Sequence, residues 1–244
     1  MNIICSPLDT PRTRKCSGSG LGWGYFFMKT ANKHKLASSL RTIAFFDGQN
    51  LFHAAKEAFG YDYPNYDPKK LAKAICVQQG WQLVETHFYT GVPNASDNAF
   101  WYHFWVTKLG QIGRGKNVYT FSRSLRYRPR TITTPSGQQQ TVFIGEEKGI
   151  DVRIAIDCIR SAHKQTYDVA LIFSQDQDLS EVAEEIRTIA KEQNRWIKIA
   201  CAFPANIGKK NSRGIDKTDW IKIDKALYDA CLDQRDYRPP KIAP

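Results

Sequence analysis

The sequence predicts an α/β fold in which a doubly wound, mainly parallel sheet lies between two layers of helices and carries one inserted basic β-hairpin. Short apolar runs at 43–46 and 169–173, typical of strands buried on both faces, alternate with segments of helical periodicity. Acidic side chains follow directly where these runs end. Because the carboxyl ends of parallel strands open onto one crevice, we expect those acids to converge.

Strands and helices alternate along the chain from residue 41. The predicted strands are 42–47, 83–92, 118–121, 168–173, 196–203 and 220–223. The predicted helices are 50–59, one that begins at Pro68 with Asp67 as its cap, 97–109, 149–162, 178–192 and one that ends near 233. Strand–helix alternation of this kind is typical of a parallel sheet covered on both faces.

Residues 123–144 do not fit the alternation and predict a hairpin, with Leu125–Thr133 against Gln140–Ile144. Alternate positions of its first strand would place three arginines on one face. These arginines, a neighbouring one and a second basic loop are the predicted nucleic-acid contacts: Arg123, Arg126, Arg128, Arg130, Lys209, Lys210 and Arg213. The alternative is a strand edge that its charges protect against aggregation.

The chain of 244 residues is long enough for one sizeable core, which we place at 41–234. Residues 1–40 lack periodicity and predict a poorly ordered N-terminal extension, and 235–244 predict a disordered tail. The six cysteines form no CxxC pair, and no secretory segment or apolar run of about 20 residues is present. We therefore expect a cytoplasmic protein with reduced thiols and no membrane span.

The net charge of +11 favours a polyanionic partner, although a basic protein that is simply soluble has the same composition. The aromatic helix at 97–109 carries Phe100, Trp101, Phe104 and Trp105 at helical spacing. That spacing predicts core packing or a homodimer contact more than a base-stacking platform.

Four carboxylates and one amide stand at predicted strand ends or helix starts: Asp47, Asn50, Asp151, Asp176 and Asp178. Each alone could be a helix cap or a turn residue. Together, carboxylates about 4 Å apart would repel by roughly 4 kcal/mol at an effective dielectric constant near 20. Shared protons or a bound cation would relieve that repulsion. A divalent metal is the simpler solution, so the pattern predicts a metal site. Asp157 lies on another helical face, so we expect it to form a salt bridge or to support a metal ligand by a hydrogen bond, and not to bind the ion itself.

Three segments, FFDGQNL, EKGIDVRIAIDCIRSA and DVALIFSQDQDLSEVAEEI, resemble in order the motifs of the NYN family, the LabA-like branch of the PIN-like nuclease fold. The resemblance spans roughly 41–204. It implies a Rossmannoid three-layer domain, a Mg²⁺ or Mn²⁺ site and RNA cleavage that leaves a 5′-phosphate and a 3′-hydroxyl. It also implies metal-binding roles for Asp47, Asp151, Asp176 and Asp178, and a catalytic role for Asn50.

One motif departs from the family pattern. Where the family usually has Ser-Gly-Asp-Ser-Asp-Phe, this chain has Gln175, Gln177 and Leu179 at the second, fourth and last positions. Our hypothesis is a metal-dependent endoribonuclease, and the alternative is a non-catalytic RNA-binding or regulatory module. A small-molecule phosphohydrolase is disfavoured by the basic charge, and a dinucleotide enzyme by the missing GxGxxG turn.

Overall fold

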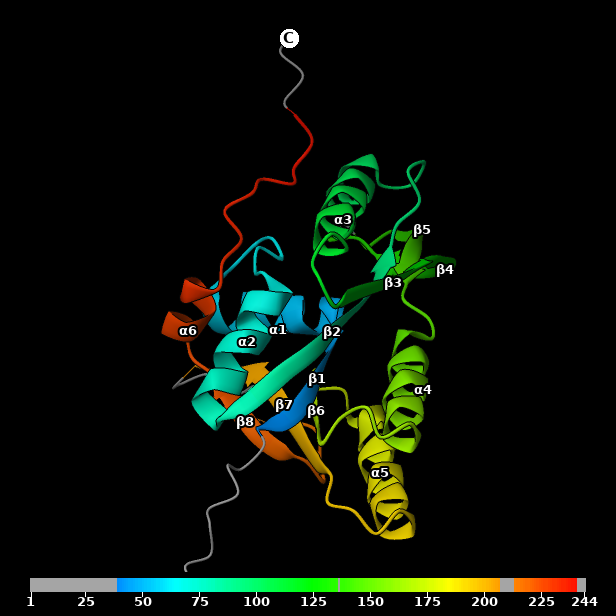
Figure 1. Cartoon of the computed structure of the whole chain (residues 1–244). Helices are drawn as coiled ribbons and strands as arrows, with labels where there is room; N and C mark the ends of the chain where they lie inside the picture. Colours follow the sequence, from blue (N-terminus) through cyan, green and yellow to red (C-terminus); the bar gives the residue numbers. More distant parts are fainter. Residues whose placement is uncertain (1–38, 136, 207–212, 241–244) are drawn as a thin grey trace, which may run out of the picture. The chain divides into compact units, whose positions relative to one another are not determined.

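The centre of the fold is a six-stranded sheet in which all neighbouring strands are parallel (Figure 1). The computed structural model describes residues 39–135, 137–206 and 213–240. In sheet order the strands are β3 (Val118–Ser124), β2 (Trp81–Val92), β1 (Leu40–Asp47), β6 (Val169–Phe173), β7 (Lys198–Pro204) and β8 (Asp219–Ile223). The chain order reverses between β1 and β6, and this switch point is where α/β sheets bind ligands. The predicted doubly wound α/β fold is confirmed.

Helices cover both faces of the sheet (Figure 1). One face holds α1 (Gly48–Phe59), α2 (Pro68–Gln79), α3 (Ala99–Ile112) and α6 (Lys225–Ala230), and the other holds α4 (Ile150–His163) and α5 (Ser180–Glu192). In β1, Ala44 and Phe46 pack on the first face, while Ile43 and Phe45 pack on the second. This two-sided burial explains the continuous apolar run in the strand. None of the helices in the described part of the chain has the length and apolar character that crossing a bilayer requires.

The helix starts follow the predicted pattern with two differences. The Asp67 side chain accepts a hydrogen bond from the Lys70 N–H at 3.0 Å and caps α2, as expected. The cap of α3 is Asn98 rather than the neighbouring Asp97. The helix predicted from 178 begins instead with a 3₁₀ turn, η1 (Gln177–Leu179), before α5 starts at Ser180.

The predicted inserted hairpin is present as a separate two-stranded antiparallel sheet of β4 (Arg126–Thr133) and β5 (Gln139–Glu146). Residues directly opposite one another in an antiparallel pair share a face. The pairs Arg126–Glu146 and Arg128–Ile144 therefore lie on one face, and Tyr127–Gly145 lies on the other. The arginines alternate as the sequence predicts.

The aromatic helix α3 contributes to the core. Phe104 and Trp105 are buried beneath it, whereas Trp101 is only partly buried. Cys76, Cys158 and Cys201, which the sequence suggests are reduced core thiols, are buried and unpaired, as is Cys231. The aromatic helix α3 therefore fills the core through Phe104 and Trp105 and leaves Phe100, Trp101 and Tyr102 partly or largely exposed.

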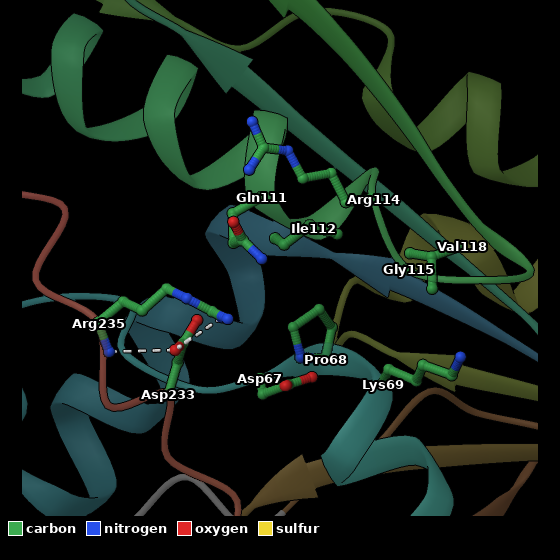
Figure 2. A pocket seen from close by; sticks show the side chains of 10 residues that line it. All are labelled: Asp67, Pro68, Lys69, Gln111, Ile112, Arg114, Gly115, Val118, Asp233 and Arg235. Carbon is green, nitrogen blue, oxygen red and sulfur yellow. Dashed lines mark hydrogen bonds and ion pairs between the residues drawn. The ribbon is translucent and has the colours of Figure 1, made fainter.

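The chain beyond α6 packs on the domain through Tyr237, which is buried with its ring 5.9 Å from that of Phe104. Tyr237 of the predicted tail thus packs on the domain. Residues 241–244 lie outside the described residues, as do 1–38 of the predicted extension. A hollow of about 270 Å³ lies between this segment, the start of α2 and the end of α3. Figure 2 shows the side chains that line it. Asp233 and Arg235 pair at its edge, and no predicted site residue lines it.

Lys108 of α3 is fully buried, and its Nζ donates a hydrogen bond to the Tyr66 carbonyl at 2.9 Å. Burial lowers the pKa of Lys108 from 10.5 to about 8, so the charged form is disfavoured in the folded state. We expect Lys108→Met to raise the free energy of unfolding at pH 7 by about 1–3 kcal/mol, because the lost desolvation cost exceeds one hydrogen bond.

The gain from Lys108→Met should shrink between pH 8 and pH 10.5. In that window the folded lysine has lost its proton while the unfolded one keeps it, so the wild type gains stability as the pH rises. Urea denaturation across this range measures both effects, and Lys73→Met at an exposed position of α2 is the control. A less stable Lys108→Met protein at pH 7 would show that the hydrogen bond outweighs the desolvation.

Candidate functional site

Asp47 ends β1 and is the most buried of the predicted site acids, with 5% of its surface exposed. Its Oδ1 accepts a hydrogen bond from the Asn50 N–H at 3.0 Å, which caps α1, and its Oδ2 accepts one from the Ser174 hydroxyl at 3.3 Å. Burial raises the pKa of Asp47 to about 6, and the charges of Asp176 and Asp151 raise it further against those hydrogen bonds. Three of the predicted acids are therefore close enough to interact.

Asn50 joins the two strand ends. Its side-chain Oδ1 accepts a hydrogen bond from the Gln175 N–H at 2.9 Å, just beyond β6. Its own N–H is held by Asp47 at the end of β1. The amide therefore fixes the spacing between the β1 and β6 ends, which is a positioning role that the three-residue separation from Asp47 makes possible.

Asp176 and Asp178 follow β6 but occupy different surroundings. Asp176 Oδ1 accepts a hydrogen bond from the Asp178 N–H at 3.0 Å, and the Asp176 N–H donates to the Ser174 hydroxyl at 3.2 Å. Asp176 is half-buried and acts on Asp47, whereas the Asp178 side chain is exposed. The structure thus places Asp176 near Asp47, whereas Asp178 contacts Asp176 only through its backbone N–H.

Asp151 lies in the first turn of α4, which begins after Gly149. Gly149 has φ = +72°, a conformation that residues with a Cβ rarely adopt. A Cβ at Gly149 would also lie 2.5 Å from Nη1 of Arg123. Gly149 therefore allows both the backbone turn that starts α4 and the close approach of Arg123 to that turn.

Glu147 is a site carboxylate that our sequence reasoning missed. Burial raises its pKa to about 7, and the charges of Asp47 and Asp151 contribute. Its Oε2 accepts a hydrogen bond from the Gly91 N–H at the end of β2, where a Cβ would lie 2.7 Å from that oxygen. The adjacent acids Glu146 and Glu147 at the end of a predicted strand were the available signal, since neighbouring strand residues point to opposite faces.

Asp47, Glu147, Asp151 and Asp176 form what we call the acid cluster. Their oxygens are the ligands that Mg²⁺ and Mn²⁺ prefer, and burial, together with the charges of the neighbouring acids, raises the pKa of Asp47 and of Glu147. The chemistry of the donor set therefore fits a divalent cation. Within the described ranges, however, no three His, Cys, Asp or Glu side chains are arranged so that they could hold a metal ion as they stand.

Asp157 lies outside the acid cluster, as the sequence predicts. It accepts a hydrogen bond from Arg153 Nε at 2.8 Å and from the Tyr89 hydroxyl at 3.0 Å, and it lies 3.7 Å from Arg160 Nη1. These contacts satisfy its charge within α4 and β2. It is thus a structural ion-pair partner.

The predicted basic residues fall in three places. Arg126, Arg128 and Arg130 share the face of β4 that also holds Glu146, and Arg130 pairs with Glu146 at 2.7 Å. Arg123 lies beside the start of α4, with Nη1 3.5 Å from the Lys148 carbonyl. Further along the chain, Arg213 pairs with Asp216, and Lys209 and Lys210 lie outside the described residues.

Gln175 and Gln177, two of the three departures from the family motif, hold a neighbouring loop in place. Gln175 Nε2 donates to the Arg213 carbonyl at 2.7 Å. Gln177 Nε2 donates to the Gly214 carbonyl at 3.0 Å, and its Oε1 accepts from the Asp216 N–H at 3.2 Å. Both amides therefore hold residues 213–216 against the turn that carries Asp176.

An α/β domain whose strand ends hold a cluster of acids defines a class that includes metal-dependent phosphotransfer and hydrolysis sites. The profile of the NYN domain family matches residues 41–195 of this chain. The protein belongs to the NYN family, whose fold is PIN-like and nuclease-like. Its place in the LabA-like branch stays a prediction.

A solved protein of unknown function from Vibrio parahaemolyticus is similar in structure, with 19% sequence identity and a TM-score of 0.44. The similarity covers 80% of this chain and 96% of that one. No curated protein matches the chain.

Proposed function

We propose that this protein is a metal-dependent endoribonuclease. The observation that carries the proposal is the buried Asp47 at the sheet's switch point, with a pKa raised to about 6 and two further acids acting on it. Family membership favours phosphodiester cleavage, and the net charge of +11 favours a nucleic-acid substrate.

Asp47, Asp151 and Asp176 would hold Mg²⁺ or Mn²⁺, with Glu147 and Asp178 at the edge of the site. When bound, the ion would lower the pKa of a water molecule and neutralise the scissile phosphate. Asn50 keeps the β1 and β6 ends together, and Ser174 orients Asp47. Because the acids do not yet converge, the side chains have to turn toward one another.

The test is cleavage of single-stranded and structured RNAs with Mg²⁺, Mn²⁺ or a chelator. We expect the wild type to cut only with a divalent ion, and Asp176→Asn to lose activity. Asp157→Asn is the control: it removes a carboxylate charge outside the acid cluster, and this variant should keep its cleavage activity. Wild-type cleavage no faster than that of Asp176→Asn would refute the enzymatic proposal.

The arginine face of β4 would bind RNA phosphates. Arg128 and Arg130 pair with Glu146 but are themselves exposed, so their guanidinium groups can exchange a carboxylate for a phosphate. We expect Arg128→Gln with Arg130→Gln to weaken RNA binding and to reduce the slope of log affinity against log salt by about 1–2. Lys191→Gln, exposed at the end of α5, is the control. An unchanged slope would remove the hairpin from the RNA-binding surface.

A second candidate is a non-catalytic RNA-binding module of the same fold. Two observations favour it. Among the described residues the acids are not arranged to hold a metal ion, and Gln175 and Gln177, at two positions of the family motif, bind the 213–216 loop instead. RNA binding that persists equally in wild type and Asp176→Asn, without cleavage in either, would select it.

A further inference from the structure

A groove of about 480 Å³ runs between α1, α3 and the hairpin. Aromatic side chains line it from three elements: Phe52 of α1, Trp101 of α3, and Tyr127 and Phe143 of the hairpin. The ring centroids of Phe52 and Trp101 are 6.2 Å apart. Its volume lies within the range of roughly 300–1,000 Å³ of small-ligand sites.

The groove begins beside the acid cluster. Gln49, which lines it, is two residues from Asp47, and its Nε2 donates a hydrogen bond to the Gly91 carbonyl at 3.1 Å. The N–H of the same Gly91 is bound by Glu147. One backbone residue at the end of β2 therefore separates the groove from the acids, so a ligand in the groove would reach toward them.

The hairpin presents its aromatic and basic side chains on opposite faces. Tyr127 pairs with Gly145 and Pro129 with Phe143 on one face, while the alternating arginines occupy the other. A Cβ at Gly145 would lie 3.0 Å from the Tyr127 ring, so the glycine makes room for that ring. Phe143 is 70% exposed, so its ring is accessible to a ligand in the groove.

We propose that this groove binds an unstacked base of single-stranded RNA and places the adjoining phosphate at the acid cluster. Every base has two faces that stack on aromatic rings, and the Gln49 and Asn98 amides at the groove offer polar groups to its edge. The arginine face of the same hairpin binds the flanking phosphates. A duplex, whose bases are already stacked and paired, does not fit. The inference rests on the proposed action on RNA and names its substrate class.

The test measures equilibrium binding of a labelled oligouridylate in the presence of EDTA, so that no cleavage occurs. Phe143→Ala removes a stacking surface at an exposed position where folding is not at risk. We expect it to weaken oligouridylate binding by about 5- to 20-fold. Ile132→Ala is the control, because Ile132 is an exposed apolar residue of the same hairpin that pairs on the arginine face, and it should leave binding unchanged.

Two further ligands separate base stacking from phosphate attraction. An oligomer of abasic riboses should bind the wild type and Phe143→Ala equally, and so should a blunt RNA duplex. An equal loss on the abasic oligomer, no loss on oligouridylate, or no wild-type binding of oligouridylate would overturn the proposal. If the groove instead binds a protein segment, Phe143→Ala should bind oligouridylate as tightly as the wild type does.

Cleavage by the wild type and by Asp176→Asn, measured in parallel with Mn²⁺, keeps this inference distinct from the proposed nuclease activity. Base-dependent binding without cleavage would retain the groove and refute the enzyme. If the wild type cleaves RNA and Phe143→Ala binds oligouridylate as tightly as the wild type, the nuclease activity is retained and the base-binding groove is refuted.

Discussion

Replacing Asp47 with asparagine is expected to abolish RNA cleavage and, at the same time, to stabilise the protein above pH 7. The cleavage rate should fall by about 100-fold or more. Even mutation of a residue that only hydrogen-bonds to a metal ligand typically lowers metal affinity or activity by about 10- to 100-fold. Asparagine can keep both hydrogen bonds, because its Oδ1 accepts from the Asn50 N–H and its Nδ2 donates to the Ser174 hydroxyl. The change therefore removes charge and little else.

The stability gain follows from the raised pKa of Asp47. Between its ordinary value of 3.8 and about 6, the folded protein holds the proton more tightly than the unfolded chain, so wild-type stability falls as the pH rises through this window. Above pH 6 the ionised side chain costs up to about 3 kcal/mol at 1.4 kcal/mol per pKa unit. Asp47→Asn should thus unfold at higher urea concentration at pH 8, with a difference that vanishes near pH 3.8.

Divalent ions provide a readout of the site that does not depend on activity. Mg²⁺ or Mn²⁺ should raise the melting temperature of the wild type at pH 8, because an ion that binds only the folded state stabilises it. The increase should be absent from Asp47→Asn and present in Asp157→Asn. If Asp47→Asn is less stable than the wild type at pH 8, or gains as much from the ion, the acid cluster is not a metal site.

Phe173→Ala should cost about 3–5 kcal/mol of the free energy of unfolding, the usual loss for a buried phenylalanine. The Phe173 ring stacks on that of Phe46, with centroids 3.8 Å apart and planes 8° from parallel, and both side chains are fully buried. These residues directly precede Ser174 and Asp47. The stack therefore locks the ends of β6 and β1 side by side, and we expect its loss to reduce cleavage as well.

Ile186→Ala separates these two effects. Ile186 is fully buried in α5 and packs on the opposite face of the sheet, so its truncation should cost about 2–5 kcal/mol. At a temperature where both variants are folded, Ile186→Ala should cleave RNA like the wild type and Phe173→Ala should not. Equal activity of the two would mean that the aromatic stack supports stability alone.

The sequence predicts the parts of this structure that depend on local pattern. The run that ends at Asp47 reads as a buried strand because both of its faces are apolar, and the placement of Asn50 follows from the helical turn after it. Asp67-Pro68 marks a helix start because the Asp67 side chain caps the N–H of Lys70, three residues on, and proline suits the first helical position. Asp157 points away from the cluster because of helical geometry alone.

Other features depend on contacts between distant segments. Glu147 joins the acid cluster because the register of β4 and β5 sends Glu146 to the arginines, and no local pattern determines that register. The roles of Gln175 and Gln177 require a loop nearly 40 residues away. Likewise, burial of Tyr237 depends on α3, more than 100 residues earlier, so composition alone suggested a disordered tail.

The hairpin register has a consequence for how this domain can vary. A slip of β5 by a single position would exchange the surroundings of two consecutive acids, turning Glu146 toward the buried aspartates and Glu147 toward the guanidinium groups. Insertions or deletions at the base of the hairpin should therefore be tolerated in steps of two, whereas odd-numbered changes would disturb the charges of the arginine face and of the acid cluster together.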